Sequence, residues 1–300
     1  MSERRTGIVY ALLAYGIWGG LPLYLRQVRH VPPLQVLAHR IVWSFGLLLV
    51  LMLVGQEARR QAWARLRAEP RVLLTFVATA IALTINWFVY IWAVDAGRVI
   101  DGSLGYFINP LFSVVLAVVV LKERLRSAQW AAVAIAGLGV LWLTLLAGQL
   151  PWIGLTLAVS FGFYGLLRKT AALAALSGLA LETALLFPLA LAYLAFVHHH
   201  ADGVWTHAST RLRFFLVLAG PLTALPLLSF AAGARRIPLS LLGILQYIGP
   251  SLQFLLGIAV FKEEFAPKKL VGFALIWLSL LLYSLESILF ARSRAAQREA

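Results

Sequence analysis

Long apolar segments, separated by short connections that hold most of the charged residues, fill almost the whole chain. An apolar segment of roughly 20 residues can cross a membrane as one α-helix. Membrane strands would be about half as long and would alternate apolar with polar positions, so the pattern predicts helices. The ten predicted spans cover about residues 7–25, 34–54, 72–94, 103–121, 128–147, 151–167, 178–197, 212–232, 239–261 and 269–290.

One short sequence within these spans is written twice. The residues from Tyr106 to Pro110 lead through an apolar run to Lys122-Glu123, and the residues from Gln246 to Pro250 lead at the same spacing to Lys262-Glu263. A weaker match aligns Ala14–Gly19 with Ser160–Gly165. The chain is therefore predicted to hold two five-helix units, residues 1–148 and 149–300, which form one transmembrane domain.

The number of spans in each unit decides how the two units are related. Because five is odd, the second unit enters the membrane from the opposite side and is inverted with respect to the first. The expected fold class is an all-α integral membrane protein, with ten transmembrane helices in two inverted five-helix repeats.

The composition agrees with a membrane protein. Hydrophobic residues make up 61% of the chain and charged residues 13%, about half the charged fraction of soluble proteins. There are no cysteines, which excludes disulfides and thiolate chemistry. The net charge of +14 would suggest nucleic acid in a soluble protein. Here it marks the connections between spans, and we expect no nucleic-acid partner.

The distribution of Lys and Arg predicts the orientation. With a cytoplasmic N-terminus, most of these residues fall in cytoplasmic connections, including the basic run from Arg59 to Arg71. Both chain termini are therefore expected in the cytoplasm. The connection after the ninth span, with Lys262 and Lys268, opposes this trend.

Two prolines interrupt spans at equivalent places in the two units. Pro110 and Pro250 each lie about a third of the way into a span, where proline removes one helical hydrogen bond and bends the helix. They can be packing kinks, which membrane helices tolerate. Their equivalent positions favour hinges beside a central cavity.

Polar and aromatic side chains within the spans are expected to face inward, because lipid offers them no hydrogen-bonding partner. Each could serve only to join two helices. Together they suggest an aromatic-rich cavity for a small ligand that has both apolar and hydrogen-bonding parts. The candidate cavity residues are Trp18, Asn86, Trp87, Tyr106, Asn109, Tyr164, Gln246 and Tyr247.

Three ionisable residues, His39, Arg40 and Glu182, lie in or near spans. Because they are near span ends, extension of the charged group to the membrane surface is the simplest interpretation. The alternative is that His39 or Glu182 exchanges a proton coupled to transport. His198-His199-His200 is interpreted as part of a solvated connection, so no metal site is expected.

These motifs together resemble the EamA family of the drug/metabolite transporter superfamily, and within it the RarD-like permeases. The resemblance covers all ten segments and is carried by Ala14–Gly19, His39-Arg40, Asn86-Trp87, Ser103–Leu111, Phe163–Leu166 and Gln246–Pro250. It implies a bacterial inner-membrane exporter of amino acids, other metabolites or drugs. It also implies a substrate path among the first, third, fourth, sixth, eighth and ninth spans.

We therefore expect a secondary transporter, most simply an exporter, that moves a small amphipathic metabolite by alternating access and uses no cofactor. Its partners would be the small-molecule substrate and membrane lipid. The sequence lacks phosphate-binding loops, the HExxH metal motif and the GxSxG nucleophile motif. A membrane-embedded enzyme acting on lipid or an isoprenoid, and a non-transporting sensor or assembly partner, are the alternatives.

Overall fold

The computed structural model describes residues 2–95, 99–148, 152–200, 202–260, 262 and 267–299, and this part of the chain contains helices and no strands. The helices are α1 (Glu3–Leu25), α2 (Pro33–Val54), α3 (Gln56–Ala68), α4 (Val72–Asp95), α5 (Val99–Val119), α6 (Ser127–Ala147), α7 (Trp152–Thr170), α8 (Ala175–His199), α9 (Val204–His207), α10 (Thr210–Ala234), α11 (Leu239–Leu245), α12 (Ile248–Ala259) and α13 (Pro267–Glu299). Glu263 lies outside the described residues.

Eight stretches of the described chain are long and apolar enough to cross a membrane. They include the α11–α12 region, Leu239–Ala259, taken as one stretch. The other two predicted spans fall on α5, whose apolar part is shorter, Gly105–Val119, and on α7, which ends with Arg168 and Lys169. The chain is thus a multi-pass helical membrane protein. That it crosses the membrane ten times remains a proposal.

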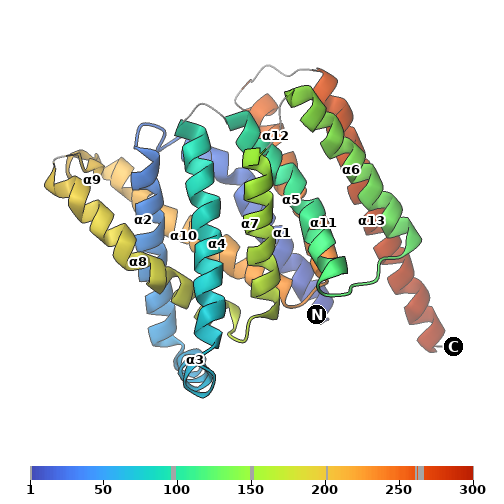
Figure 1. Cartoon of the computed structure of the whole chain (residues 1–300), viewed down its shortest axis with the longest axis horizontal. Helices are drawn as coiled ribbons and strands as arrows, with labels where there is room; N and C mark the ends of the chain where they lie inside the picture. The colour runs from blue at the N-terminus through green and yellow to red at the C-terminus, as the bar shows by residue number, and fades with distance from the viewer. Residues whose placement is uncertain are drawn as a thin grey trace.

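The bundle packs in a pattern that is nearly the same when its two halves are exchanged. Helix α1 contacts α10 and α12, whereas α7 contacts α4 and α5. Between the halves α2 packs on α8, α5 on α11 and α6 on α13, and the α6–α13 pair forms one edge of the bundle (Figure 1). Close approach of Gly139 to Gly272 lets α6 and α13 pack tightly.

The two copies of the repeated sequence end in the same unusual backbone conformation. Lys122 and Lys262 have φ angles of 56° and 57°, and no other non-glycine residue in the described ranges has a positive φ. Such angles are uncommon for residues with a side chain. After Lys122 the chain turns so that the Glu123 N–H donates to the Ala117 carbonyl at 2.9 Å.

Two features of the fold were not predicted from the pattern of apolar spans. Helix α3 is a polar, Arg-rich helix between α2 and α4, at the same end of the bundle where α1 begins and α13 ends (Figure 1). The predicted ninth span is broken into α11 and α12 at Gln246 and Tyr247.

Candidate functional site

A cavity of about 160 Å³ lies between the two halves of the bundle. It is lined by α1, α2, α4 and α5 from the first half and by α7, α10 and the α11–α12 region from the second. The lining residues include Leu25 at the end of α1, Tyr90 near the end of α4, and Tyr106 in the first half of α5. The cavity is therefore displaced toward the end of the bundle where α1 and α4 finish and α2 and α5 begin.

Most of the predicted cavity residues meet here. Trp18, Asn86, Trp87, Tyr106, Asn109 and Gln246 all line the cavity, as does Pro250. Tyr164 and Tyr247 do not line it, although both are completely buried. Pro110 is not on the lining either; its carbonyl lies where α5 crosses Gly243 of α11, so close that a side chain at Gly243 would touch it.

Two amides hold the walls of the cavity together. The Asn86 side chain donates to the Leu157 carbonyl at 2.9 Å and to the Ser160 hydroxyl at 3.1 Å, which joins α4 to α7. The Gln253 side chain donates to the Trp18 carbonyl at 3.1 Å, which joins α12 to α1. Each bond therefore joins a helix of one half to a helix of the other.

Pro250 contributes to the helix break beside the cavity. Proline has no N–H, so the carbonyl of Gln246, four residues earlier, loses its helical donor. That carbonyl instead accepts from the Gly249 N–H at 3.1 Å, a tighter turn that separates α11 from α12. Helix α5 continues through Pro110 without interruption.

Arg40 lies on the cavity wall. The sequence interpretation had instead placed its charged group at the membrane surface. Its Nε donates to the Thr223 hydroxyl at 2.9 Å, and its guanidinium carbon lies 5.4 Å from the centre of the Trp87 ring. The interpretation was wrong because distance from the end of the helix does not show which way a side chain points.

An aromatic cluster separates the cavity from the other end of the bundle. Phe230 lies at its centre, with ring centres of Phe161 at 5.1 Å, Trp18 at 5.9 Å and Tyr164 at 5.9 Å. The Tyr15 hydroxyl, on the same side, donates to the Leu242 carbonyl at 2.9 Å. These contacts join α1, α7, α10 and α11.

Polar contacts close the bundle beyond the aromatic cluster. The Glu123 carboxylate accepts hydrogen bonds from the Leu239 N–H at 2.7 Å and the Ser240 hydroxyl at 2.6 Å, so it caps the start of α11. The Lys169 ammonium donates to the Ala234 and Ile237 carbonyls at 3.0 and 2.6 Å. A carboxylate at a helix N-terminus and a cation at a carbonyl of the last helical residue, here Ala234, are both favourable placements.

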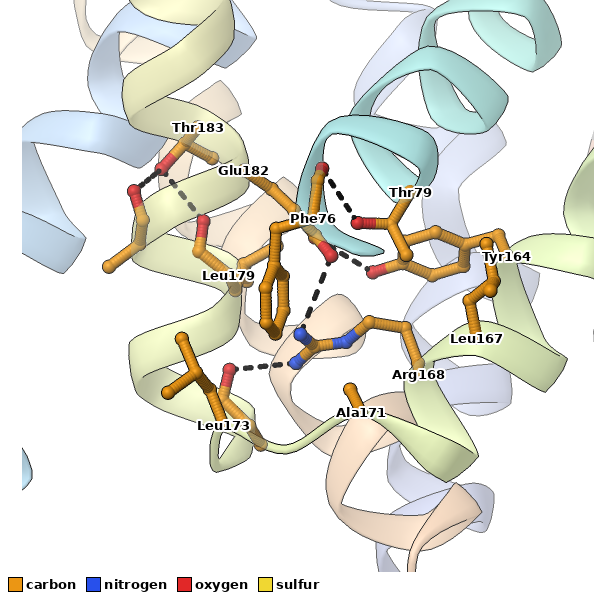
Figure 2. A network of polar contacts seen from close by, with 12 residues as sticks. Phe76, Thr79, Tyr164, Leu167, Arg168, Ala171, Leu173, Leu179, Glu182 and Thr183 are labelled. Atoms are coloured by element: carbon orange, nitrogen blue, oxygen red, sulfur yellow. Dashed lines mark hydrogen bonds and ion pairs between the residues drawn. The ribbon is translucent and has the colours of Figure 1, made fainter. Parts of the chain in front are cut away.

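Glu182 points into the protein core, which corrects its interpretation as a surface-reaching group. Figure 2 shows its carboxylate between Arg168 at 3.4 Å and the Tyr164 hydroxyl at 3.3 Å. Glu182 and Arg168 are 0% and 1% exposed. Arg168 also donates to the Ala175 carbonyl at 2.9 Å, and the missing side chain of Gly178 leaves room for its guanidinium.

His39 is buried too, but in a second cavity of about 290 Å³ between α2, α8 and α9. Its ring lies 5.5 Å from that of Trp205, and its Nδ1 has no hydrogen-bonding partner among the described residues. The surface interpretation of His39 is therefore also corrected. His200 is exposed and its ring contacts the Phe196 carbonyl at 2.9 Å.

Several residues at the site were not predicted, above all Arg40, Thr223 and Phe230. The alignment of Ala14–Gly19 with Ser160–Gly165 contained part of the missing signal, because it pairs Tyr15 with Phe161, and both line the cavity. Nothing in the apolar run of α10 marked Phe230 as different from its neighbours.

Comparison with known proteins gives consistent matches. Residues 5–145 match the model of the EamA-like transporter family. An uncharacterized transporter of Pseudomonas aeruginosa is 44% identical, covering 95% of both chains, and the protein RarD of Escherichia coli is 40% identical, covering 96% of both. A crystal structure with 20% identity has a TM-score of 0.69 and covers 94% of this chain and 98% of its own, which shows a shared fold.

Proposed function

This chain belongs to the EamA-like transporter family and is a membrane transporter of the RarD type, and we propose that it exports small amphipathic molecules across a bacterial inner membrane by alternating access. The observation that carries the proposal is the cavity between the halves, which has lining residues from both and the packed aromatic cluster around Phe230 on the side where α1 begins. A substrate site between two repeats is typical of secondary transporters.

The proposed architecture is ten spans in two inverted repeats, divided at residues 148 and 149. The exchange pattern of helix contacts supports it, as does the shared backbone conformation of Lys122 and Lys262. Both chain ends lie at the same end of the bundle as α3 (Figure 1). With the Lys and Arg distribution, this supports cytoplasmic termini.

In this orientation the structure represents a state closed toward the cytoplasm. Phe230 and its aromatic neighbours, Glu123 and Lys169 all lie between the cavity and the cytoplasmic end. Opening that side requires separation of α5 from α11, with the bend at Pro250 and a second bend at Pro110 as hinges. As the cytoplasmic side opens, its contacts break and equivalent contacts form on the opposite side of the cavity.

Flux measurements on purified protein in vesicles test the proposal. Vesicles with and without the protein are loaded with labelled amino acids, organic acids and drugs, and loss of label is followed. As a site control, Gly249→Leu fills the cavity, while Gly137→Leu adds the same side chain on α6, where nothing lies within 4 Å of the added Cβ. We expect Gly249→Leu alone to abolish flux.

Each alternative predicts a different result. A membrane enzyme would change the labelled compound chemically, and a sensor would leave flux equal with and without protein. Within the described residues, no group of three or more His, Asp or Glu side chains is placed to hold a metal ion. Unchanged flux across the whole panel would contradict the transport proposal.

A further inference from the structure

The described lining of the cavity contains one positive charge and no negative partner for it. Among the described residues, Arg40 is the single Lys or Arg on the lining, and no described Asp or Glu lines the cavity with it. Within the described part of the chain, its electrostatic neighbours are the phenol groups of Tyr24, Tyr90 and Tyr106. These groups are neutral at ordinary pH, so they do not balance the charge.

The guanidinium is also only partly used as a hydrogen-bond donor. Arginine has five N–H groups in a planar fork that matches a carboxylate or phosphate. Of these, Nε donates to Thr223, and the two terminal nitrogens make no hydrogen bond to any described residue. Thr223 and the face of Trp87 hold the group in place on one side and leave its donors free on the other.

A cation inside a membrane protein is costly, by roughly 2.5–3.5 kcal/mol on insertion scales, and therefore calls for a function. For Arg168 the cost is offset by the Glu182 carboxylate within the protein. Arg40 has no such partner in the described chain, so a bound ligand is the group that can supply the balancing charge.

The rest of the lining indicates the body of that ligand. Trp18, Trp87 and Phe161 provide apolar faces, and Asn109 and Gln246 provide uncharged polar groups. The volume of about 160 Å³ is close to that of an engineered protein cavity of about 150 Å³ that binds benzene. A single aromatic ring with a short side chain suits this space.

Building on the proposed transport function, we propose that Arg40 anchors the anionic head group of the substrate, which is a small organic monoanion with an aromatic or apolar body. A zwitterion is disfavoured because the described lining offers no carboxylate to its ammonium group. Arg40 thus sets substrate charge, and the aromatic walls accept substrates that differ in shape.

Four compounds with one phenyl ring test the charge preference without any mutation. Phenylacetate is an anion, 2-phenylethanol is neutral, phenethylamine is a cation and phenylalanine is a zwitterion. A ligand that binds only the folded protein raises its thermal unfolding midpoint. For the purified wild-type protein, we expect a rise with phenylacetate well above the rise with the other three. Equal rises with all four, or none with phenylacetate, would overturn the proposal.

Substitutions then assign the preference to Arg40. Arg40→Gln should weaken phenylacetate binding roughly ten- to hundredfold, the loss expected for a charge-assisted hydrogen bond, and leave binding of 2-phenylethanol unchanged. Arg40→Lys should keep the preference for the anion with lower affinity. Arg211→Gln, which removes an exposed arginine from α10, is the matched control and should bind as the wild type does.

Two further outcomes separate this proposal from related ones. Stabilisation by phosphatidylglycerol in place of phenylacetate would identify a lipid phosphate as the anion and overturn the proposal. Binding is measured separately from flux. A wild-type protein that transports but shows no charge preference in binding therefore refutes only the role of Arg40. A charge preference in a protein without flux refutes the transport function alone.

Discussion

Glu182 and Arg168 show how two ionisable residues can be buried together in the core of the bundle. Either charge alone would be expensive there, but the two are paired and the Tyr164 hydroxyl and Ala175 carbonyl satisfy part of their remaining hydrogen bonding. This arrangement favours a structural role for Glu182, and proton coupling through it remains a prediction that flux can test.

The pair predicts strongly non-additive mutations. Glu182→Leu leaves an uncompensated guanidinium and should destabilise the protein by about 3–5 kcal/mol, whereas adding Arg168→Met should recover most of the loss, because a buried ion pair can be replaced by apolar residues. Unfolding of the two single variants and the double variant in the same detergent measures this. A double variant whose loss equals the sum of the single losses would show that the two residues do not act as a pair.

Proton coupling by His39 or Glu182 predicts a change in pH dependence. If one of them carries the coupled proton, replacing it with Gln should abolish the response of flux to pH, because Gln cannot be protonated in the same range. Flux of His39→Gln and Glu182→Gln is compared with the wild type from acidic to alkaline pH. A variant that keeps the wild-type profile removes its residue from the coupling mechanism.

The location of polar residues could be predicted better than their role. Polarity in an apolar span showed that Asn86 and Tyr164 face inward, and both do. It did not show that Asn86 lines the cavity while Tyr164 joins the closed side, because both locations are inside the protein. The same limit applied to Arg40, whose environment depends on Thr223 and Trp87 from other helices.

At the scale of helices, small residues decide how closely the two halves approach. Gly220 of α10 lies against the backbone of Trp43 in α2, where an added Cβ would come within 2.5 Å of the Trp43 carbonyl carbon. This contact belongs to a pair of helices from different halves. Backbone cannot move aside as a flexible side chain can, so any side chain at Gly220 pushes α10 away from α2.

Gly220→Ala should therefore destabilise the protein by about 1–3 kcal/mol through overpacking. Gly46→Ala, on α2 itself, is the matched control because nothing lies within 4 Å of its added Cβ. The Gly46→Ala change should be neutral or stabilising by up to about 1 kcal/mol, since alanine has a higher helix propensity than glycine. The thermal unfolding midpoints of the two variants test this prediction. Equal midpoints for Gly220→Ala and Gly46→Ala would contradict the close contact at Gly220.

The two prolines predict an effect on movement rather than on affinity. Pro110→Ala and Pro250→Ala restore a possible helical N–H and should make each helix harder to bend. We expect flux to slow more than ligand binding weakens, with Pro250 more sensitive because the helix is already broken there. Flux and thermal stabilisation by ligand, measured on the same samples, separate the two effects. Wild-type flux in both variants would refute the hinges.

Apolar length predicted where the helices are because it is the property that the membrane selects. Each of the ten predicted segments falls on helix in the described chain, but the same property could not reveal α3, which is helical and polar. It also could not reveal the break at Gln246 and Tyr247, which depends on hydrogen bonds within an unbroken apolar run. Composition shows where a helix can lie in lipid and not whether its backbone is continuous.

For the molecule as a whole, the proposed transport mechanism depends on the two halves running in opposite directions. If they do, the cavity lies near a pseudo-twofold axis, and closing one side by contacts between α5 and α11 has a counterpart on the other side. Figure 1 agrees with this relation, because α6 begins at the lower end of the bundle and α13 at the upper end. The connections that precede these helices contain Lys122 and Lys262.

Labelling of single cysteines tests the inversion directly, and the wild-type chain has no cysteine to interfere. Arg60→Cys on α3, Arg124→Cys before α6 and Lys268→Cys at the start of α13 all place the thiol at an exposed residue. In intact cells, a membrane-impermeant maleimide should label Lys268→Cys and leave the other two unlabelled until the membrane is permeabilised. Labelling after permeabilisation confirms that each thiol can react. Should Arg124→Cys and Lys268→Cys react from the same side, the halves are not inverted, and the proposed exchange of closed ends is impossible, because both would face one compartment.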